Sequence, residues 1–448
     1  MANRVANNPD YPHIAESEVL HARAVDLIPA ATQTLAKGPG QHVEGVAPKY
    51  LRRGRGSHVW DVDGNEYLDF NMAIGPLSLG YAYPAVDEAI RAQLADGITF
   101  SQMHPLEVEV AERVHALVPG AEMVRFSKTG CDVTSAAVRL ARAFTGRRKI
   151  LCCGYHGWHD WYISVTDRNS GIPEGVQDLS FTFEYNNTDS VLQAIDDDTA
   201  CIILEPVVFE EPGPGFLESL RTICDERGIV LIFDEMWTGF RLDLGGAQAH
   251  YGVTADLACF SKAVANGMPL SVLTGRRQVM RLLERQVFFF TTFGGEALSL
   301  AAARATLDEL CAKDVLATLW ARGKRLKDGV NAIFRELGID YVSCVGPECR
   351  SLVAFHEKAG PPLELKSLVQ QELIKRGVLW SGFHNVSYSH DEADIEYALG
   401  AYREVFALLA DAVSRRTVRS QIRGKLVEPV FRRTSSFNLK PKPTRARG

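Results

Sequence analysis

Apolar and polar residues recur with two different periods along the middle of the chain. Short runs that are apolar on both faces predict buried strands at residues 149–155, 200–206, 229–235, 257–262 and 270–275. Segments with the period of an amphipathic helix fall among them at 132–145, 189–196 and 216–227. Strands buried on both faces that alternate with helices are typical of a largely parallel sheet covered on both sides. We therefore expect an α/β fold.

The pattern changes on either side of this region. Residues 58–70, HVWDVDGNEYLDF, alternate around Asp63-Gly64-Asn65 and predict a β-hairpin, whereas residues 84–97 have a helical period. After a helical stretch from about 296 to 336, the segments YVSCVG, SLVAFH and GVLWSG indicate a smaller α+β domain. The expected division is an N-terminal segment 1–75 that contributes to the small domain, a large domain 76–320, a small C-terminal domain 321–412 and a basic, flexible tail 413–448.

Composition and charge narrow the class of protein. The 448 residues are 46% hydrophobic and 23% charged, which is an ordinary soluble globular composition. The net charge is -6, although residues 415–448 hold 11 Lys and Arg against one Glu, so the acidic body is not expected to bind nucleic acid. Apolar runs of signal-peptide or membrane-span length are absent, and the nine cysteines form no C-x-x-C pair. We expect a cytoplasmic protein with reduced thiols and no membrane partner.

Polar residues end four of the predicted strands. These residues are Tyr155, Glu205, Asp234 and Lys262. The lysine of FSKAVANGMP could simply cover apolar surface with its stem, and a single carboxylate could cap a helix. In open α/β sheets, however, ligands bind outside the carboxyl ends of the strands, so four polar ends at one edge favour a binding site. His156 and His159 lack a third ligand at suitable spacing, so they favour a hydrogen-bonded loop, and we expect no metal site.

The stretch Thr129-Gly130-Cys131-Asp132 opens a predicted helix. Free N–H groups at a helix N-terminus favour a phosphate, although Asp132 or Thr134 could serve only as a cap. Combined with a lysine and a buried aspartate, the stretch indicates pyridoxal 5'-phosphate. The aldehyde would join Lys262, the phosphate would lie at Gly130 and Cys131, and the ring nitrogen would meet Asp234, which keeps it protonated as an electron sink.

Several motifs resemble the class III aminotransferases. They are WDVDGNEYLDF, VRFSKTGCDVTSAAVRLARAFTGR, YHGWHDW and IVLIFDEMWTGFRLDLGGAQAHYGVTADLACFSKAVANGMPL, and the resemblance covers roughly residues 20–410. It implies the pyridoxal-phosphate transferase fold type I, with the large domain binding the cofactor. It also implies that Lys262 forms the Schiff base, that Tyr155 stacks on the ring and that Met236 lies on its other face. Glu205 belongs to the same cofactor site, and Thr292 in TTFGGEALSLAAA would reach the phosphate of a neighbouring subunit, which implies a homodimer with shared active sites.

Within that family the chain is similar to glutamate-1-semialdehyde 2,1-aminomutase and related aminotransferases of oxo-sugars and cyclic ketones. It departs from the aminomutase at Cys131-Asp132, at Glu296-Ala297 and at Lys37, where an arginine commonly meets the substrate carboxylate. These departures favour transfer of an amino group, with L-glutamate as donor, to a polyhydroxylated oxo-sugar or carbocyclic ketone in a biosynthetic pathway.

Alternative activities remain open at this point. They are an aminomutase, an aminotransferase coupled to dehydration and aromatisation of a cyclic ketone, and a binding protein without turnover. The residues expected to contact the substrate are Lys37, Trp380, His384 and Asn385.

Overall fold

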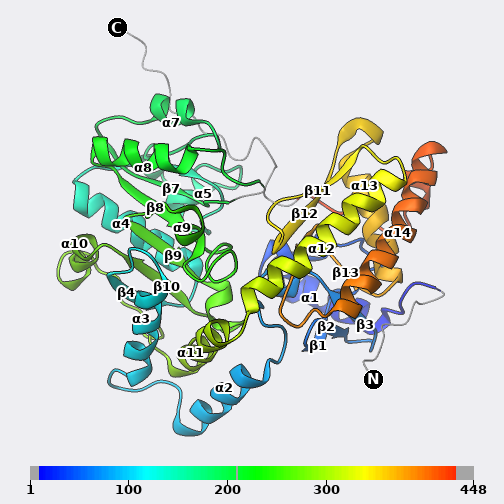
Figure 1. Ribbon diagram of the computed structural model, residues 1–448, viewed down its shortest axis with the longest axis horizontal. Coiled ribbons are helices and arrows are strands. Elements are labelled where there is room, and N and C mark those ends of the chain that lie inside the picture. Colours follow the sequence, from blue (N-terminus) through cyan, green and yellow to red (C-terminus); the bar gives the residue numbers. More distant parts are fainter. Residues whose placement is uncertain (1–9, 208–209, 430–448) are drawn as a thin grey trace. The chain divides into compact units, whose positions relative to one another are not determined.

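The computed structural model describes residues 10–207 and 210–429. The chain divides into two compact units, which can be followed by colour along the sequence in Figure 1. Residues 84–314 form the central unit, and residues 10–83 together with 315–429 form the terminal unit. All the polar residues that end predicted strands belong to the central unit.

The central unit contains, within its described residues, a sheet in the order β4-β10-β9-β8-β7-β5-β6. Its strands are β4 (Met123–Ser127), β5 (Lys149–Cys153), β6 (Ser180–Thr182), β7 (Thr199–Leu204), β8 (Val230–Asp234), β9 (Leu257–Phe260) and β10 (Ser271–Gly275). Strands β9, β8, β7, β5 and β6 run parallel, whereas β10 pairs antiparallel with both β9 and β4. The prediction of a mostly parallel sheet from five apolar runs is confirmed.

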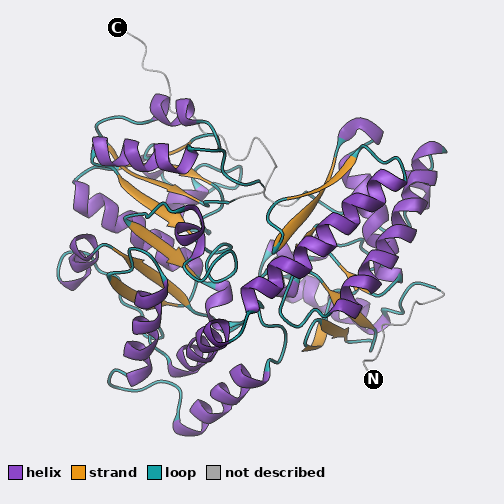
Figure 2. Cartoon of the chain, viewed as in Figure 1, coloured by secondary structure: helices purple, strands orange, loops and turns teal. Residues whose placement is uncertain are grey.

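Helices cover this sheet on both faces, and Figure 2 shows the strands of this unit running between helices. The helices of this unit are α2 (Pro84–Asp96), α3 (Pro105–Leu117), α4 (Gly130–Thr145), α5 (Asp160–Ile163), α6 (Glu174–Gln177), α7 (Thr188–Ala194), α8 (Phe216–Arg227), α9 (Gly246–Tyr251), α10 (Arg277–Met280) and α11 (Ala297–Ala312). Alternate residues of one strand enter different clusters: Ile150 and Cys152 join the cluster of α4, and Leu151 joins that of α8. Burial on both faces explains why the strands are apolar throughout.

The terminal unit holds two small sheets and four longer helices among its described residues. One sheet has the order β1-β2-β3-β13 and the other β11-β12-β14. The strands are β1 (Leu51–Arg55), β2 (His58–Asp61), β3 (Glu66–Asp69), β11 (Val342–Val345), β12 (Arg350–Phe355), β13 (Val378–Leu379) and β14 (Phe383–Asn385), and the longer helices are α1 (Ala15–Leu27), α12 (Val315–Glu336), α13 (Pro362–Lys375) and α14 (Glu392–Ser414). Strands β2 and β3 pair antiparallel, which confirms the predicted hairpin.

The expected flexible tail, 413–448, is only partly within the described residues, because 430–448 lie outside them. Its first part was wrongly expected to be flexible. After α14 the chain forms the short helix α15 (Val418–Gln421) and then packs against the terminal unit, where Val427 is 2% exposed. Among the described residues, none of the helices combines the length and the apolarity needed to cross a lipid bilayer.

Candidate active site

Four polar residues lie at one edge of the central sheet. Tyr155 and Glu205 follow β5 and β7, Asp234 ends β8, and Lys262 follows β9. These four strands are neighbours and run parallel, so their carboxyl ends share that edge. The sequence-based expectation that the four side chains come from a single edge is confirmed, and this edge is where an open α/β sheet binds its ligand.

Asp234 is held by a buried histidine that the sequence analysis placed only in a hydrogen-bonded loop. The Asp234 side chain is 1% exposed, and its Oδ2 lies 2.8 Å from Nδ1 of His156, which is itself 2% exposed. The other oxygen, Oδ1, accepts a hydrogen bond from the backbone N–H of Met236 at 3.1 Å. Two partners therefore fix the carboxylate at the strand end.

The second nitrogen of His156 also faces an acceptor. Its Nε2 lies 3.1 Å from the carbonyl oxygen of Cys153. Both ring nitrogens therefore face protein oxygen atoms, which fixes the orientation of the ring beside Asp234. The signal in the sequence was a histidine one residue after a strand-end tyrosine, on a strand close to that of Asp234.

Glu205 orders the turn that presents Tyr155. Its carboxylate is 2% exposed and its Oε2 accepts a hydrogen bond from the backbone N–H of Tyr155 at 2.7 Å. Gly154 in this turn has φ +109°, and a Cβ there would lie 2.6 Å from the same oxygen. The Tyr155 side chain is 37% exposed and packs edge-on against Tyr162, with ring centroids 5.5 Å apart. One ring face of Tyr155 can therefore stack on a planar ligand.

The turn before α4 is packed so closely that a side chain at either of two glycine positions would collide with a neighbouring residue. A Cβ on Gly130 would lie 2.9 Å from Sδ of Met236, and a Cβ on Gly157, at φ +104°, would lie 2.3 Å from Cβ of Cys131. Asp132 completes a capping box, because its Oδ2 accepts from the N–H of Thr129 at 2.8 Å. Partial burial alone would raise the pKa of Asp132, but the hydrogen bonds from Thr129 and its neighbours outweigh burial and lower it. The 16-residue helix thus presents a tight, glycine-lined N-terminus suited to a phosphate.

Lys262 has a strained backbone. It begins the 3₁₀ turn η5 (Lys262–Ala265) with φ +46°, a left-handed conformation that is costly for a residue with a side chain. Its Nζ lies 3.4 Å from the ring centroid of Trp237, an aromatic contact that the sequence analysis did not anticipate. Strain of this kind, at a lysine that follows the strand next to that of Asp234, is typical of functional sites.

Thr292 is exposed in the turn before α11. The N-cap of that helix is Glu296, whose carboxylate accepts from the N–H groups of Leu298 at 2.9 Å and Ser299 at 3.0 Å. Because Glu296 caps the helix, a capping role does not explain why a threonine stands at position 292.

The residues expected to contact the substrate fall into two groups, both in the terminal unit. Lys37 is exposed and lines a cavity of about 370 Å³ together with Asp69, Tyr81 and Ser381. The other three belong instead to the interior, so the expectation that they contact substrate is wrong for this structure. Trp380 and His384 are fully buried, and Asn385 is 3% exposed.

Internal partners explain this correction. The ring nitrogens of His384 lie 2.8 Å from Oγ of Ser351 and 2.6 Å from the hydroxyl of Tyr402, and Asn385 Nδ2 donates to the carbonyl of Asn71 at 3.0 Å. Hydrophobic burial and these hydrogen bonds turn the polar side chains of β14 inward, away from a ligand.

A group of possible metal ligands also lies at the start of α4. The ligand atoms of Cys131, Asp132 and His159 lie within 4.8 Å of one another. Each atom already has a protein partner: Cys131 Sγ lies 3.0 Å from Thr129 Oγ1, Asp132 caps the helix, and His159 Nδ1 lies 2.5 Å from Ser135 Oγ. The cluster is therefore accounted for by the packing of the turn.

These residues fit pyridoxal phosphate. A buried carboxylate at a strand end can meet a pyridine nitrogen, a lysine on the next strand can join an aldehyde, and a glycine-lined helix N-terminus can take a phosphate.

Comparison with known proteins also supports pyridoxal phosphate as the cofactor. The model of the family described as "Aminotransferase class-III" matches residues 41–385. The chain is 35% identical over 407 residues to 3-aminobutyryl-CoA aminotransferase of Cloacimonas acidaminovorans, covering 88% of this chain and 97% of that protein. It is 34% identical over 421 residues to glutamate-1-semialdehyde 2,1-aminomutase of Syntrophobacter fumaroxidans, covering 87% and 97%.

Solved structures agree. The chain has a TM-score of 0.82 and 28% identity to the pyridoxal-phosphate form of the FumI protein of Sphingopyxis sp. MTA144, over 89% of this chain and 97% of that one. The TM-score is 0.80 and the identity 26% for an omega-transaminase from Sphaerobacter thermophilus, over 89% and 98%. The chain belongs to the class III aminotransferases, and it is a pyridoxal-phosphate-dependent transaminase. The resemblance seen in the sequence is confirmed.

Proposed function

We propose that this enzyme moves an amino group from L-glutamate to a polyhydroxylated oxo-sugar or carbocyclic ketone in a biosynthetic pathway. The observation that carries the acceptor class is the lining of the terminal-unit cavity, which combines Lys37, Asp69, Tyr81 and Ser381. The Tyr81 hydroxyl donates to Asp69 Oδ2 at 2.7 Å. A cavity with several hydrogen-bonding groups favours a ketone acceptor with several hydroxyls over an apolar ketone.

The residues of the candidate active site, all in the central unit, have separate roles in this reaction. Pyridoxal phosphate, when bound, supplies an electron sink that lets the Cα–H bond of the amino donor break. With the cofactor bound, the amine of Lys262 would carry the proton between Cα of the donor and C4′ of the cofactor, acting first as base and then as acid. Asp234, oriented by His156 and the Met236 N–H, holds the proton on the ring nitrogen. The exposed ring face of Tyr155 restrains the ring.

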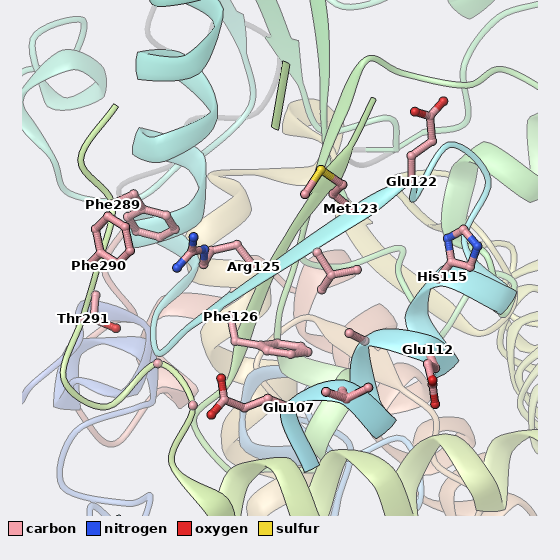
Figure 3. Close-up of a pocket in the computed structure, with 15 residues that line it drawn as sticks. Glu107, Glu112, His115, Glu122, Met123, Arg125, Phe126, Phe289, Phe290 and Thr291 are labelled. Atoms are coloured by element: carbon pink, nitrogen blue, oxygen red, sulfur yellow. The ribbon is translucent and has the colours of Figure 1, made fainter. Parts of the chain in front are cut away.

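We further propose a homodimer in which Thr292 from a second copy of the chain completes the phosphate site. The support is the surface around this turn, where the side chains of Phe288, Phe290 and Phe293 are 72%, 52% and 57% exposed. Phe290 lines a cavity of about 540 Å³ together with Glu107, Arg125, Phe126 and Thr291 (Figure 3). An apolar cluster of this kind is costly in water and favours cover by a partner.

The free cysteines support the cytoplasm, which is the compartment that the sequence favours. All nine are free thiols, and burial raises the pKa of Cys152 and Cys153 well above its usual value, to about 12 for Cys153. Inert, reduced thiols are the rule in reducing compartments.

A second candidate is an aminomutase of the glutamate-1-semialdehyde type. The observation in its favour is the 34% identity over 421 residues to such an enzyme. The two reactions use the same proton transfers but differ in whether the oxo product leaves. An aminotransferase whose cyclic product then loses water is a variant of the first proposal.

One experiment separates these activities. The purified enzyme is incubated with glutamate alone while its visible spectrum and the released 2-oxoglutarate are followed, and then with a panel of ketones in excess. We expect glutamate to remove the visible absorbance of the bound cofactor and to release one equivalent of 2-oxoglutarate per site. A polyhydroxylated ketone should then restore the absorbance. An unchanged spectrum with glutamate contradicts the donor assignment. Isomerisation of glutamate-1-semialdehyde without any added donor would establish the aminomutase instead.

A further inference from the structure

The cavity of the terminal unit is built mainly from one irregular loop. Residues 36–49 supply most of its lining, including Lys37, His42 and Glu44. This loop contains only the short 3₁₀ turns η2 (Leu35–Lys37) and η3 (Pro39–Gln41). A segment with so few hydrogen bonds of its own takes its conformation from the elements packed against it.

The C-terminal segment Thr417–Glu428, which we call the strap, lies along this loop. The N–H of Lys425 donates to the carbonyl of Glu44 at 3.0 Å, and the N–H of Glu428 donates to the carbonyl of Gly40 at 2.7 Å. The Lys425 Nζ lies 2.9 Å from a carboxylate oxygen of Glu44 and lowers the pKa of that carboxyl. These two backbone hydrogen bonds fix the last four residues of the strap in register with the loop.

Apolar packing reinforces the pairing. Val427 of the strap is 2% exposed within a cluster that includes Val43, Val46 and Ala47 of the loop. At Gly424 the two backbones approach so closely that a Cβ would lie 2.3 Å from the carbonyl oxygen of Glu44. The strap therefore replaces solvent along one side of the loop.

Two adjacent glutamines of α13 tie the loop and the strap to one helix. Both are fully buried. Gln370 accepts from the N–H of Val43 at 2.8 Å and donates to the carbonyl of Gln41 at 3.0 Å. Gln371 accepts from the N–H of Arg423 at 2.7 Å and donates to the carbonyl of Gln421 at 3.1 Å. Four hydrogen bonds of buried amides thus set the loop and the strap in a common frame.

We propose that the strap is a specificity-determining element that positions the Lys37–Lys49 loop and thereby sets which acceptor the enzyme uses. The strap lies beyond residues 41–385, which match the family model, and it contains none of the residues to which we assign the proton transfers. The identity of the cavity as the acceptor site rests on the proposed function above. The position of the loop does not, because it follows from the contacts alone.

The test compares two shortened chains. One ends at Thr417 and lacks the strap, and the matched control ends at Pro429 and keeps it. Amide hydrogen exchange of the peptide covering residues 38–47 measures the loop directly. We expect exchange of this peptide to rise at least tenfold in the chain ending at Thr417 and to stay unchanged in the control, a tenfold change corresponding to about 1.4 kcal/mol.

A point variant covers the case in which the shorter chain does not fold. Gly424→Ala drives a Cβ against the backbone of Glu44 without removing any residue. Its control is Gly400→Ala, because a Cβ at Gly400 in α14 meets no atom within 4 Å. We expect faster exchange of the 38–47 peptide only in Gly424→Ala.

Kinetics distinguish positioning from general destabilisation. With a pentahydroxycyclohexanone as the acceptor probe, we expect KM for the ketone to rise about tenfold in both strap variants while kcat stays within threefold, because the proton-transfer residues lie in the central unit. Unchanged KM, or an equal loss of kcat, overturns the inference. If the wild-type enzyme itself shows no spectral change with glutamate or no turnover of the ketone, the proposed function fails, and the exchange result then decides the strap's role alone.

Discussion

The pairing of His156 with Asp234 leads to a prediction that does not depend on the substrate. Replacing His156 with Phe leaves a ring of similar size but removes the donor that lies 2.8 Å from Asp234 Oδ2. The carboxylate is 1% exposed, so water cannot replace the lost donor. Of the two contacts described above, only the hydrogen bond from the Met236 N–H to Asp234 Oδ1 then remains.

The size of the effect follows from burial. Removing one partner of a buried, hydrogen-bonded charge pair costs about 3–5 kcal/mol. For a unit of this length, each kcal/mol lowers the melting temperature by about 2–4 °C. The cofactor-free His156→Phe variant should therefore melt roughly 6–20 °C below the wild type. The double variant His156→Phe/Asp234→Asn should recover part of this loss, because the buried carboxylate is no longer charged.

Differential scanning calorimetry of the cofactor-free protein measures this loss. The matched control is His250→Phe, since His250 is exposed at the end of α9 and its replacement should shift the melting temperature by less than about 2 °C. If His156→Phe melts within 2 °C of the wild type, or if the double variant is no more stable than the single one, the carboxylate does not depend on His156 and our account of the pair is wrong.

Four further predictions address the other groups. Borohydride reduction should fix the cofactor to Lys262, and Lys262→Ala should keep bound cofactor but lose turnover by at least about 1,000-fold, as measured by peptide mapping and glutamate-dependent assay; label on another lysine would refute the assignment. Gly157→Ala should weaken cofactor binding at least tenfold in an equilibrium titration, because its Cβ would lie 2.3 Å from Cβ of Cys131 at φ +104°; near-normal affinity would show that this turn does not hold the phosphate. Mixing Lys262→Ala with an inactive Thr292→Val protein should regenerate activity, because one site of a mixed dimer receives both intact residues; no recovery would contradict shared sites. Burial, and secondarily the charge of His390, lowers the pKa of His384 to about 3. This residue therefore stabilises the fold above its unfolded pKa of 6.5, and the contribution is lost as pH falls from there toward 3. Between pH 6.5 and 4.5 the melting temperature of His384→Gln should therefore fall less than that of the wild type, and equal slopes of melting temperature against pH would contradict this.

The gathering of four polar strand ends at one edge of the sheet could be predicted from the sequence because its determinants are local. Each of Tyr155, Glu205, Asp234 and Lys262 stands at the end of an apolar run, and the parallel topology brings those ends together without further information. The signal for His156, its place one residue after a strand-end tyrosine, was too weak to predict its partner, because its role depends on a hydrogen bond to a residue 78 positions away.

The terminal unit could not be predicted equally well, because its determinants are distant along the chain. The polar letters of GVLWSGFHN suggested a binding surface, yet His384 bonds to Ser351 and Tyr402 and faces the core. Gln370 holds Val43 across a separation of 327 positions. No periodicity records such a pairing, so the inward direction of β14 and the order of the strap follow only from the tertiary structure.

If the cavity of the terminal unit binds the acceptor, as we propose, the central unit supplies the chemistry and the terminal unit selects the acceptor, which would explain how relatives with different substrates share one fold. In the central unit, a Cβ at Gly130 or Gly157 finds no room, and Asp234 is fixed by two partners, so most substitutions there damage the cofactor chemistry itself. In the terminal unit, the cavity is bounded by a loop whose position depends on side-chain amides and on a strap outside the family match. Changes to those supports can alter the acceptor while leaving the proton transfers intact. The names of the similar proteins, which include a 3-aminobutyryl-CoA aminotransferase and an aminomutase, fit this division, and the acceptor of this enzyme should accordingly respond to changes in the strap and loop before it responds to changes around Lys262.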